Sequence, residues 1–164
     1  MKPKAIVCDI DGCLLDVSKL YLEIHKRGLK GQEMWNFFHE NANNPQYVDK
    51  IEQIFNLLNL YGKAGYSIII LTARRDIIAK STLHKLCDEY LHLSLSYLSQ
   101  MIVRPVDKEG VPSHIFKKTE LENLQEQYDI ELVIDDEYTN CATFKEMGLT
   151  VLRVLRKNNA DKNE

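Results

Sequence analysis

Near-continuous apolar runs recur along the chain and predict five buried strands. They cover residues 4–10, 68–71, 97–105, 130–134 and 149–155. Polar or charged residues follow the apolar centre of each run. A strand with one face in water alternates apolar and polar residues. A continuous run instead indicates a strand that is covered on both faces, as in a parallel sheet.

Segments with helical character separate these strands. Two helices, at 18–28 and 31–43, are broken by Gly28 and Gly31, and we expect a third at 45–65, capped by Asn44 with Pro45 at its first position. Further helices are expected at 77–91, 113–128 and 138–147, the last ending at Gly148. The alternation predicts an α/β fold, with a parallel sheet and helices on both faces.

The connection between the first two strands is longer than one crossover helix requires. We therefore expect a small helical cap insertion at residues 14–45. The core, a single domain, would comprise residues 1–13 and 46–157, followed by a polar tail at 158–164.

Composition narrows the class of protein. The chain has 164 residues, 45% of them hydrophobic, and a net charge of -3, which disfavours a chain that binds nucleic acid over its whole surface. The four cysteines lack metal-site spacing, and reduced thiols fit a cytoplasmic protein. We see no signal peptide, no apolar run of membrane-spanning length and no evident obligate protein partner.

Two acids, Asp9 and Asp11, stand at the end of the first strand. Asp and Gly are common turn residues, so D-x-D-G could simply end a strand. Two carboxylates this close repel one another, however, unless a cation or a proton lies between them. In open α/β sheets ligands bind beyond the carboxyl ends of the strands, so this stretch predicts a metal site.

Other polar residues are expected at the same edge, at strand ends or helix starts. Each has an ordinary explanation by itself, such as a helix cap or a solvated charge. Together they place acids, a hydroxyl and cations on one edge of one sheet: Thr72, Arg74, Arg104, Lys117, Lys118, Asp135 and Asp136.

These motifs resemble those of the haloacid dehalogenase (HAD) superfamily of Mg²⁺-dependent phosphohydrolases. The resemblance rests on "DIDGCLLD", "LTAR", a helix-opening lysine and "IDDEYTN", in order over nearly the whole chain. Through "LTARRD", "VRP", "PSHIFK" and "MWNFF" it is similar to the 3′-phosphatase domain of bacteriophage polynucleotide kinases and related phage phosphatases. The resemblance implies a Rossmann-like HAD fold.

The resemblance also implies roles for the residues at the motif positions. Asp9 would be the nucleophile and Asp11 the general acid and base. Thr72 would hold a phosphoryl oxygen, and Arg74 and Arg104 would contact phosphate or leaving group. Lys117 is preferred to Lys118 because it shares a helix face with Leu121 and Leu124. Mg²⁺ would be held by Asp9, the backbone carbonyl of Asp11, and Asp135 or Asp136.

The implied function is removal of a phosphate monoester from a nucleotide or a nucleic-acid 3′ end. Trp35, with Phe37 and Phe38, could stack on a base or pack the cap. Ser113 and Glu137 depart from the relatives, which have an acid and often an arginine there, and this bears on 3′-end specificity. A small-molecule phosphatase such as a 5′-nucleotidase is the alternative. A phospho-receiver domain is disfavoured because its acid pair and phosphorylated Asp follow other strands.

Overall fold

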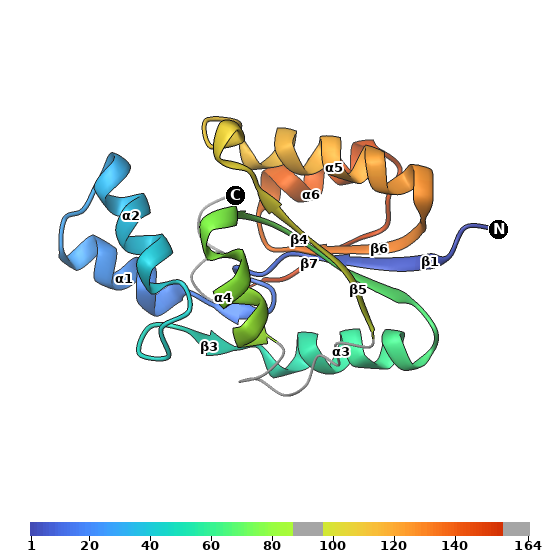
Figure 1. Ribbon diagram of the computed structural model, residues 1–164, viewed down its shortest axis with the longest axis horizontal. Coiled ribbons are helices and arrows are strands. Elements are labelled where there is room, and N and C mark those ends of the chain that lie inside the picture. The colour runs from blue at the N-terminus through green and yellow to red at the C-terminus, as the bar shows by residue number, and fades with distance from the viewer. Residues whose placement is uncertain (87–96, 156–164) are drawn as a thin grey trace.

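The structure is a computed structural model that describes residues 1–86 and 97–155. Its centre is a five-stranded parallel sheet with the strand order β5-β4-β1-β6-β7 (Figure 1). The strands are β1 (Lys4–Cys8), β4 (Ser67–Arg75), β5 (Leu98–Arg104), β6 (Asp129–Asp135) and β7 (Val151–Arg153). The predicted parallel α/β architecture is therefore confirmed.

Helices cover both faces of this sheet. Helix α3 (Glu52–Lys63) lies on one side, and α5 (Ser113–Gln127) and α6 (Tyr138–Glu146) lie on the other (Figure 1). Successive residues of β1 and β4 belong to two different cores: Ile6 and Ile68 to one, Val7 and Ile69 to the other. Because strand side chains alternate between faces, the continuous apolar runs follow directly from this two-sided burial.

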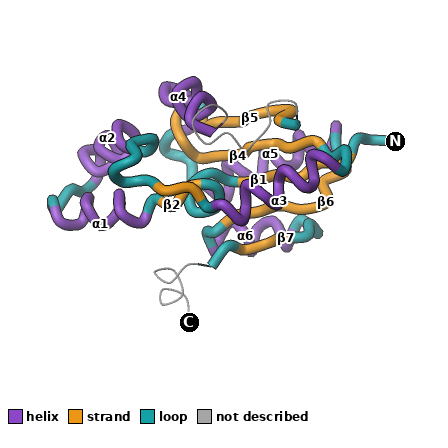
Figure 2. Tube along the Cα trace, turned by 90° about the horizontal axis from the view of Figure 1, so that it is seen from below, coloured by secondary structure: helices purple, strands orange, loops and turns teal. Residues whose placement is uncertain are grey.

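A segment of two helices, residues 17–48, extends beyond the carboxyl end of the sheet (Figures 1 and 2). It contains α1 (Ser18–Lys26) and α2 (Gly31–Asn41), and we call it the α1–α2 segment. Its base is a short antiparallel pair of strands, β2 (Leu15–Asp16) and β3 (Asp49–Lys50). This pair holds both ends of the segment next to the end of β1.

The predicted start of the third helix, at Pro45, is wrong. Residues 45–47 form a turn, in which the Asn44 side chain accepts a hydrogen bond from the Gln46 backbone N–H at 3.0 Å. Residues 49–50 then pair with β2, and α3 begins only at Glu52. Asn and Pro favour turns as much as helix starts, and the strand pairing that decides between them is not local.

Smaller elements complete the chain. A 3₁₀ turn, η1 (Asp76–Ile78), precedes α4 (Ala79–His84), and a second, η3 (Val106–Lys108), follows β5. The later part of the helix predicted at 77–91 and the tail both reach outside the described residues. Among the described residues, no helix is long and apolar enough to cross a membrane.

Candidate active site

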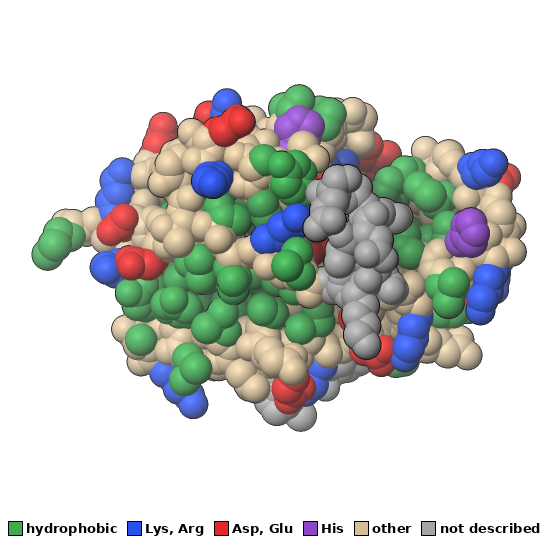
Figure 3. All heavy atoms as spheres, turned by 180° about the vertical axis from the view of Figure 1, so that it is seen from behind, with side chains coloured by type: hydrophobic (Ala, Val, Ile, Leu, Met, Phe, Trp, Pro, Cys, Tyr) green, Lys and Arg blue, Asp and Glu red, His purple; other side chains and the backbone are tan. Residues whose placement is uncertain are grey.

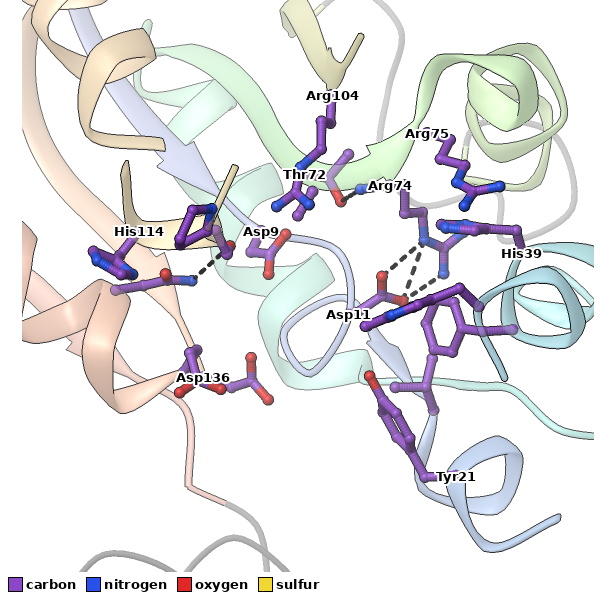
Figure 4. Close-up of a pocket in the computed structure, with 18 of the residues that line it drawn as sticks. Asp9, Asp11, Tyr21, His39, Thr72, Arg74, Arg75, Arg104, His114 and Asp136 are labelled. Carbon is purple, nitrogen blue, oxygen red and sulfur yellow. Dashed lines mark hydrogen bonds and ion pairs between the residues drawn. The ribbon is translucent and has the colours of Figure 1, made fainter. Parts of the chain in front are cut away.

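The carboxyl ends of three neighbouring strands meet at the wall of a cavity of about 1400 Å³ (Figure 4). Asp9 directly follows β1, Thr72 lies near the end of β4, and Asp135 ends β6. The opposite wall is formed by the α1–α2 segment. The order of the strands thus brings together residues that are far apart in the sequence, as their positions at strand ends predicted.

Lys117 connects two of these acids. Its ammonium lies 2.8 Å from a carboxylate oxygen of Asp9 and 2.7 Å from one of Asp135, and its side chain is 2% exposed. Lys118, by contrast, is half exposed and pairs with Glu122 across one helical turn. In the structure Lys117, the lysine that the sequence pattern favoured, therefore points toward the acids.

In this cluster the negative charges of the carboxylates outnumber the single positive charge of Lys117. Burial alone would lower the pKa of Lys117, but the carboxylates of Asp135 and Asp9 outweigh it and hold that pKa above its usual range. Burial raises the pKa of Asp9 to about 6; Lys117 opposes this rise, while Asp135 and Asp11 add to it. One ammonium shared between buried acids leaves a need for a further cation.

The acids are also arranged as a metal centre would require. Oxygen atoms of Asp9, Asp135 and Asp136 all lie within 4.8 Å of one another. Carboxylate oxygens are the ligands of hard cations such as Mg²⁺. Gly12 approaches this cluster with φ +91°, and a Cβ there would meet the Asp136 carboxyl carbon at 2.0 Å. Only glycine fits, so the D-x-D-G turn is shaped around the acidic cluster.

Asp135 is fixed by several donors. Besides Lys117, it accepts hydrogen bonds from the backbone N–H of Glu137 at 2.9 Å and from the Asn140 side-chain amide at 3.0 and 3.2 Å. The same amide lies 3.4 Å from the hydroxyl of Ser113. Asn140, which sequence reasoning missed, therefore orients an acid of the candidate metal centre.

The Asp11 side chain turns away from the metal cluster and pairs with Arg74. The Arg74 guanidinium donates from Nε to both carboxylate oxygens, at 3.2 and 3.0 Å, and from Nη2 to one of them at 2.6 Å. Its other hydrogen bonds reach Asn43 Oδ1 at 2.7 Å, Thr82 Oγ1 at 3.2 Å and the Ala42 carbonyl at 2.9 Å. All five N–H donors of the guanidinium are thereby used.

This arrangement differs from the expected role of Arg74. A contact with phosphate or leaving group would need a free donor, whereas here the fully buried guanidinium holds Asp11 against the end of the α1–α2 segment and α4. Arg104 does face the cavity. Its Nε is buried without a hydrogen-bond partner among the described residues, and burial lowers its pKa from the ordinary value.

Aromatic side chains from α1 and α2 line the cavity. Trp35 is 43% exposed and stacks on His39 with ring centroids 6.2 Å apart. Phe38 lies between Trp35 and Tyr21 at 5.9 and 5.4 Å. Phe37 instead packs against Tyr47 and is not part of the lining. Of the three aromatics considered for base stacking, Trp35 thus offers the most accessible ring.

Sequence reasoning missed several residues that line the cavity, among them Tyr21, His39, Arg75 and Arg153. Tyr21 directs its hydroxyl toward the acids in Figure 4. The place of Arg75 within "LTARRD", shortly after Thr72, is a signal in the sequence that could have identified it. For Tyr21 of α1 and His39 of α2 the sequence offers no such signal, because only the packing of that segment shows which helix face meets the sheet.

The family model described as the polynucleotide kinase PNKP phosphatase domain matches residues 3–159 of this chain. A comparison with curated proteins finds no match.

Solved structures share the fold. A chain of the Pnkp1/Rnl/Hen1 RNA repair complex is 21% identical with a TM-score of 0.72, over 93% of this chain and 42% of that one. The class C acid phosphatase from Bacillus anthracis, solved with tungstate, is 19% identical with a TM-score of 0.67, over 85% and 54%. A HAD family enzyme from Bacteroides thetaiotaomicron, solved with magnesium, is 15% identical with a TM-score of 0.60, over 96% of both chains.

This chain spans less than half the length of the chains of the repair complex that it matches. The alternative of a phospho-receiver domain is set aside by the family match, which covers almost every residue. The chain therefore belongs to the family of polynucleotide kinase phosphatase domains, and is a phosphatase of the HAD superfamily.

Proposed function

We propose that this protein is a Mg²⁺-dependent phosphohydrolase that removes the terminal phosphate from a nucleic-acid 3′ end through an aspartyl-phosphate. The observation that carries the proposal is the division of labour between the two acids of D-x-D. Asp9 lies with Lys117 and the metal cluster, whereas Asp11 is held apart by Arg74. A nucleophile and a proton donor require such different surroundings.

In the first half-reaction a carboxylate oxygen of Asp9 attacks the phosphorus, and the bond from phosphorus to the leaving oxygen breaks. Asp11, protonated, gives its proton to that oxygen, so the nucleoside leaves as an alcohol. Lys117 and Thr72 lie beside Asp9 and would stabilise the charge on the transferring group. A Mg²⁺ ion bound by Asp9, Asp135 or Asp136 and the Asp11 carbonyl would offset the repulsion between carboxylate and phosphate.

In the second half-reaction a water molecule attacks the phosphorus of the aspartyl-phosphate. Asp11, now ionised, takes a proton from that water, and Asp9 is released as a carboxylate with inorganic phosphate. Because both steps use Asp11 in one orientation, Arg74 acts as a positioning residue.

We further propose that the α1–α2 segment, predicted as a cap at residues 14–45, covers the leaving group. Its support is that Tyr21 and His39 face the acids across the cavity, and that Trp35 also lines it. Such a cover excludes water from the phosphoryl transfer and selects the alcohol that leaves. Trp35 would stack on the terminal base.

The proposal is tested by phosphate release in Mg²⁺ from a matched panel. The substrates are a DNA and an RNA oligonucleotide with a 3′-phosphate, the same oligonucleotides with a 5′-phosphate, nucleoside 3′- and 5′-monophosphates, and a sugar phosphate. We expect the highest kcat/KM with a 3′-phosphoryl end. A preference for nucleoside 5′-monophosphates would support the 5′-nucleotidase alternative, and a preference for sugar phosphates would contradict both.

A further inference from the structure

Two arginines stand side by side at the cavity wall. Arg75 of β4 and Arg104 of β5 are register partners in the parallel sheet, and both line the cavity. Their side chains diverge from neighbouring strands: Arg104 extends toward Asp9 and Thr72, and Arg75 extends toward His39 (Figure 4). Arg104 is the one nearer the nucleophile, since Asp9 is among the charges that act on it.

Arg75 is directed over the cavity by Glu109. Its Nε donates to the Glu109 carboxylate at 2.8 Å, and the two side chains are 19% and 35% exposed. Both residues line the cavity, and both side chains are partly accessible to a ligand there. An ion pair this accessible contributes little by itself and is readily exchanged for another anion.

His39 of α2 faces this pair from the other wall (Figure 4). Its Nδ1 is buried and has no hydrogen-bond partner among the described residues. Burial first, and then the charge of Arg75, lower the pKa of His39 to about 4. The imidazole is therefore neutral near neutral pH.

We propose that Arg75 and His39 form a second anion subsite, which binds the phosphodiester next to the terminal nucleotide of the substrate. This inference rests on the proposed function and deepens it. Asp11 marks the side on which the leaving nucleoside lies, and Arg75 and His39 lie beyond Asp11 on that side (Figure 4). A mononucleotide with only the scissile phosphate would leave this subsite empty.

A phosphodiester suits the subsite better than another acidic group. A planar guanidinium can bind two phosphate oxygens at once, and a neutral imidazole, such as that of His39 in the cavity lining, can donate one further hydrogen bond through a ring nitrogen. On the face seen from behind, basic and acidic side chains are interspersed over the described residues (Figure 3). With a net charge of -3, the protein is thus better suited to bind one additional phosphate in the cavity than to bind many phosphates along a basic surface.

The test compares three substrates: thymidine 3′-monophosphate, the dinucleotide TpTp with a 3′-phosphate, and TpTp with a neutral methylphosphonate linkage. Wild type should prefer the charged dinucleotide in kcat/KM. Arg75→Gln should lose about tenfold more on charged TpTp than on the monophosphate, and should cease to distinguish the charged from the neutral linkage. Its salt slope for charged TpTp should fall by about 0.7, the value for one contact with a single strand.

Lys118→Gln serves as the control, because Lys118 lies half exposed on α5 and outside the cavity lining. It should match wild type on all three substrates. Equal losses on all three substrates in Arg75→Gln would overturn the subsite, and so would a wild type that treats the two linkages alike.

Failure of the subsite and failure of the proposed function give different results. If none of the three substrates is hydrolysed, the proposed function fails. The subsite is then tested by fluorescence anisotropy with labelled TpTp and its methylphosphonate analogue. Tighter binding of the charged form by wild type, but not by Arg75→Gln, supports the subsite, and equal binding in wild type overturns it.

Discussion

At the scale of single residues, the two acids of D-x-D differ because their neighbours differ. Asp9 is buried beside Lys117 and two further acids, and Asp11 is paired with Arg74. Side chains of one type, two positions apart, thus lie in different surroundings, which other strands and helices supply. The residue-scale predictions concern these neighbours.

Asp9→Asn should abolish turnover and preserve the fold. The amide is isosteric with the carboxyl group but cannot form the aspartyl-phosphate. We expect no detectable hydrolysis of p-nitrophenyl phosphate, with an unchanged far-ultraviolet circular dichroism spectrum. Hydrolysis at the wild-type rate would show that another residue is the nucleophile.

Lys117→Ala should lower kcat by on the order of 100-fold or more, as expected for loss of one fixed donor to the transition state. It should also reduce stability by about 3 kcal/mol or more, because two buried carboxylates lose their partner. Lys118→Ala is the matched control on the same helix, and it should change neither kcat nor Tm appreciably. A larger loss in Lys118→Ala would reverse the assignment.

Arg74→Gln should impair proton donation by Asp11 more than binding. With an alkyl phosphate, whose leaving group needs the proton, kcat should fall by about 100-fold, within the range for general acid catalysis. With an aryl phosphate, whose leaving group departs as the anion, the loss should be several times smaller. Equal losses on both substrates would argue for a direct contact with phosphate instead.

At the scale of elements, the α1–α2 segment and the sheet are joined through the residues that surround the cavity. Asn43, just after α2, and Thr82, in α4, both contact the same guanidinium of Arg74. The orientation of Asp11 therefore depends on how the segment sits on the core.

Trp35→Ala should weaken turnover of a nucleotide substrate and largely spare a small aryl phosphate. Base stacking on an aromatic ring is worth about 1–3 kcal/mol, which corresponds to roughly 5- to 150-fold in kcat/KM. Phe37→Ala is the matched control from the same helix, since Phe37 packs on Tyr47 outside the cavity. It should lower Tm without a preference among substrates, and the same pattern in Trp35→Ala would mean that Trp35 only packs the segment.

At the scale of the whole molecule, the sheet brings all four motifs to one edge, and a divalent ion would complete the charge balance there. Activity should vanish in EDTA and return with Mg²⁺, because the clustered ligands are all oxygens. Mg²⁺ should also raise Tm, since a ligand that binds only the folded state stabilises it. Full activity in chelator, or recovery with Zn²⁺ alone, would contradict the metal assignment.

The sequence by itself determined the parallel sheet and the motif positions at its edge. Continuous apolar runs require burial on both faces, and strand-end residues of a parallel sheet must meet, so Asp9, Thr72 and Asp135 could be placed together. Helical spacing also indicated that Lys117, and not its neighbour, faces the core. These inferences depend on the period of the backbone, which is local.

Only the tertiary structure decided the partners of Arg74, the pairing of β2 with β3 in place of an earlier helix start, and the facing of Arg75 and His39 across the cavity. Each depends on contacts between segments distant in the chain. Such contacts follow from how the α1–α2 segment packs on the sheet. The spacing of residues along the chain does not predict that packing.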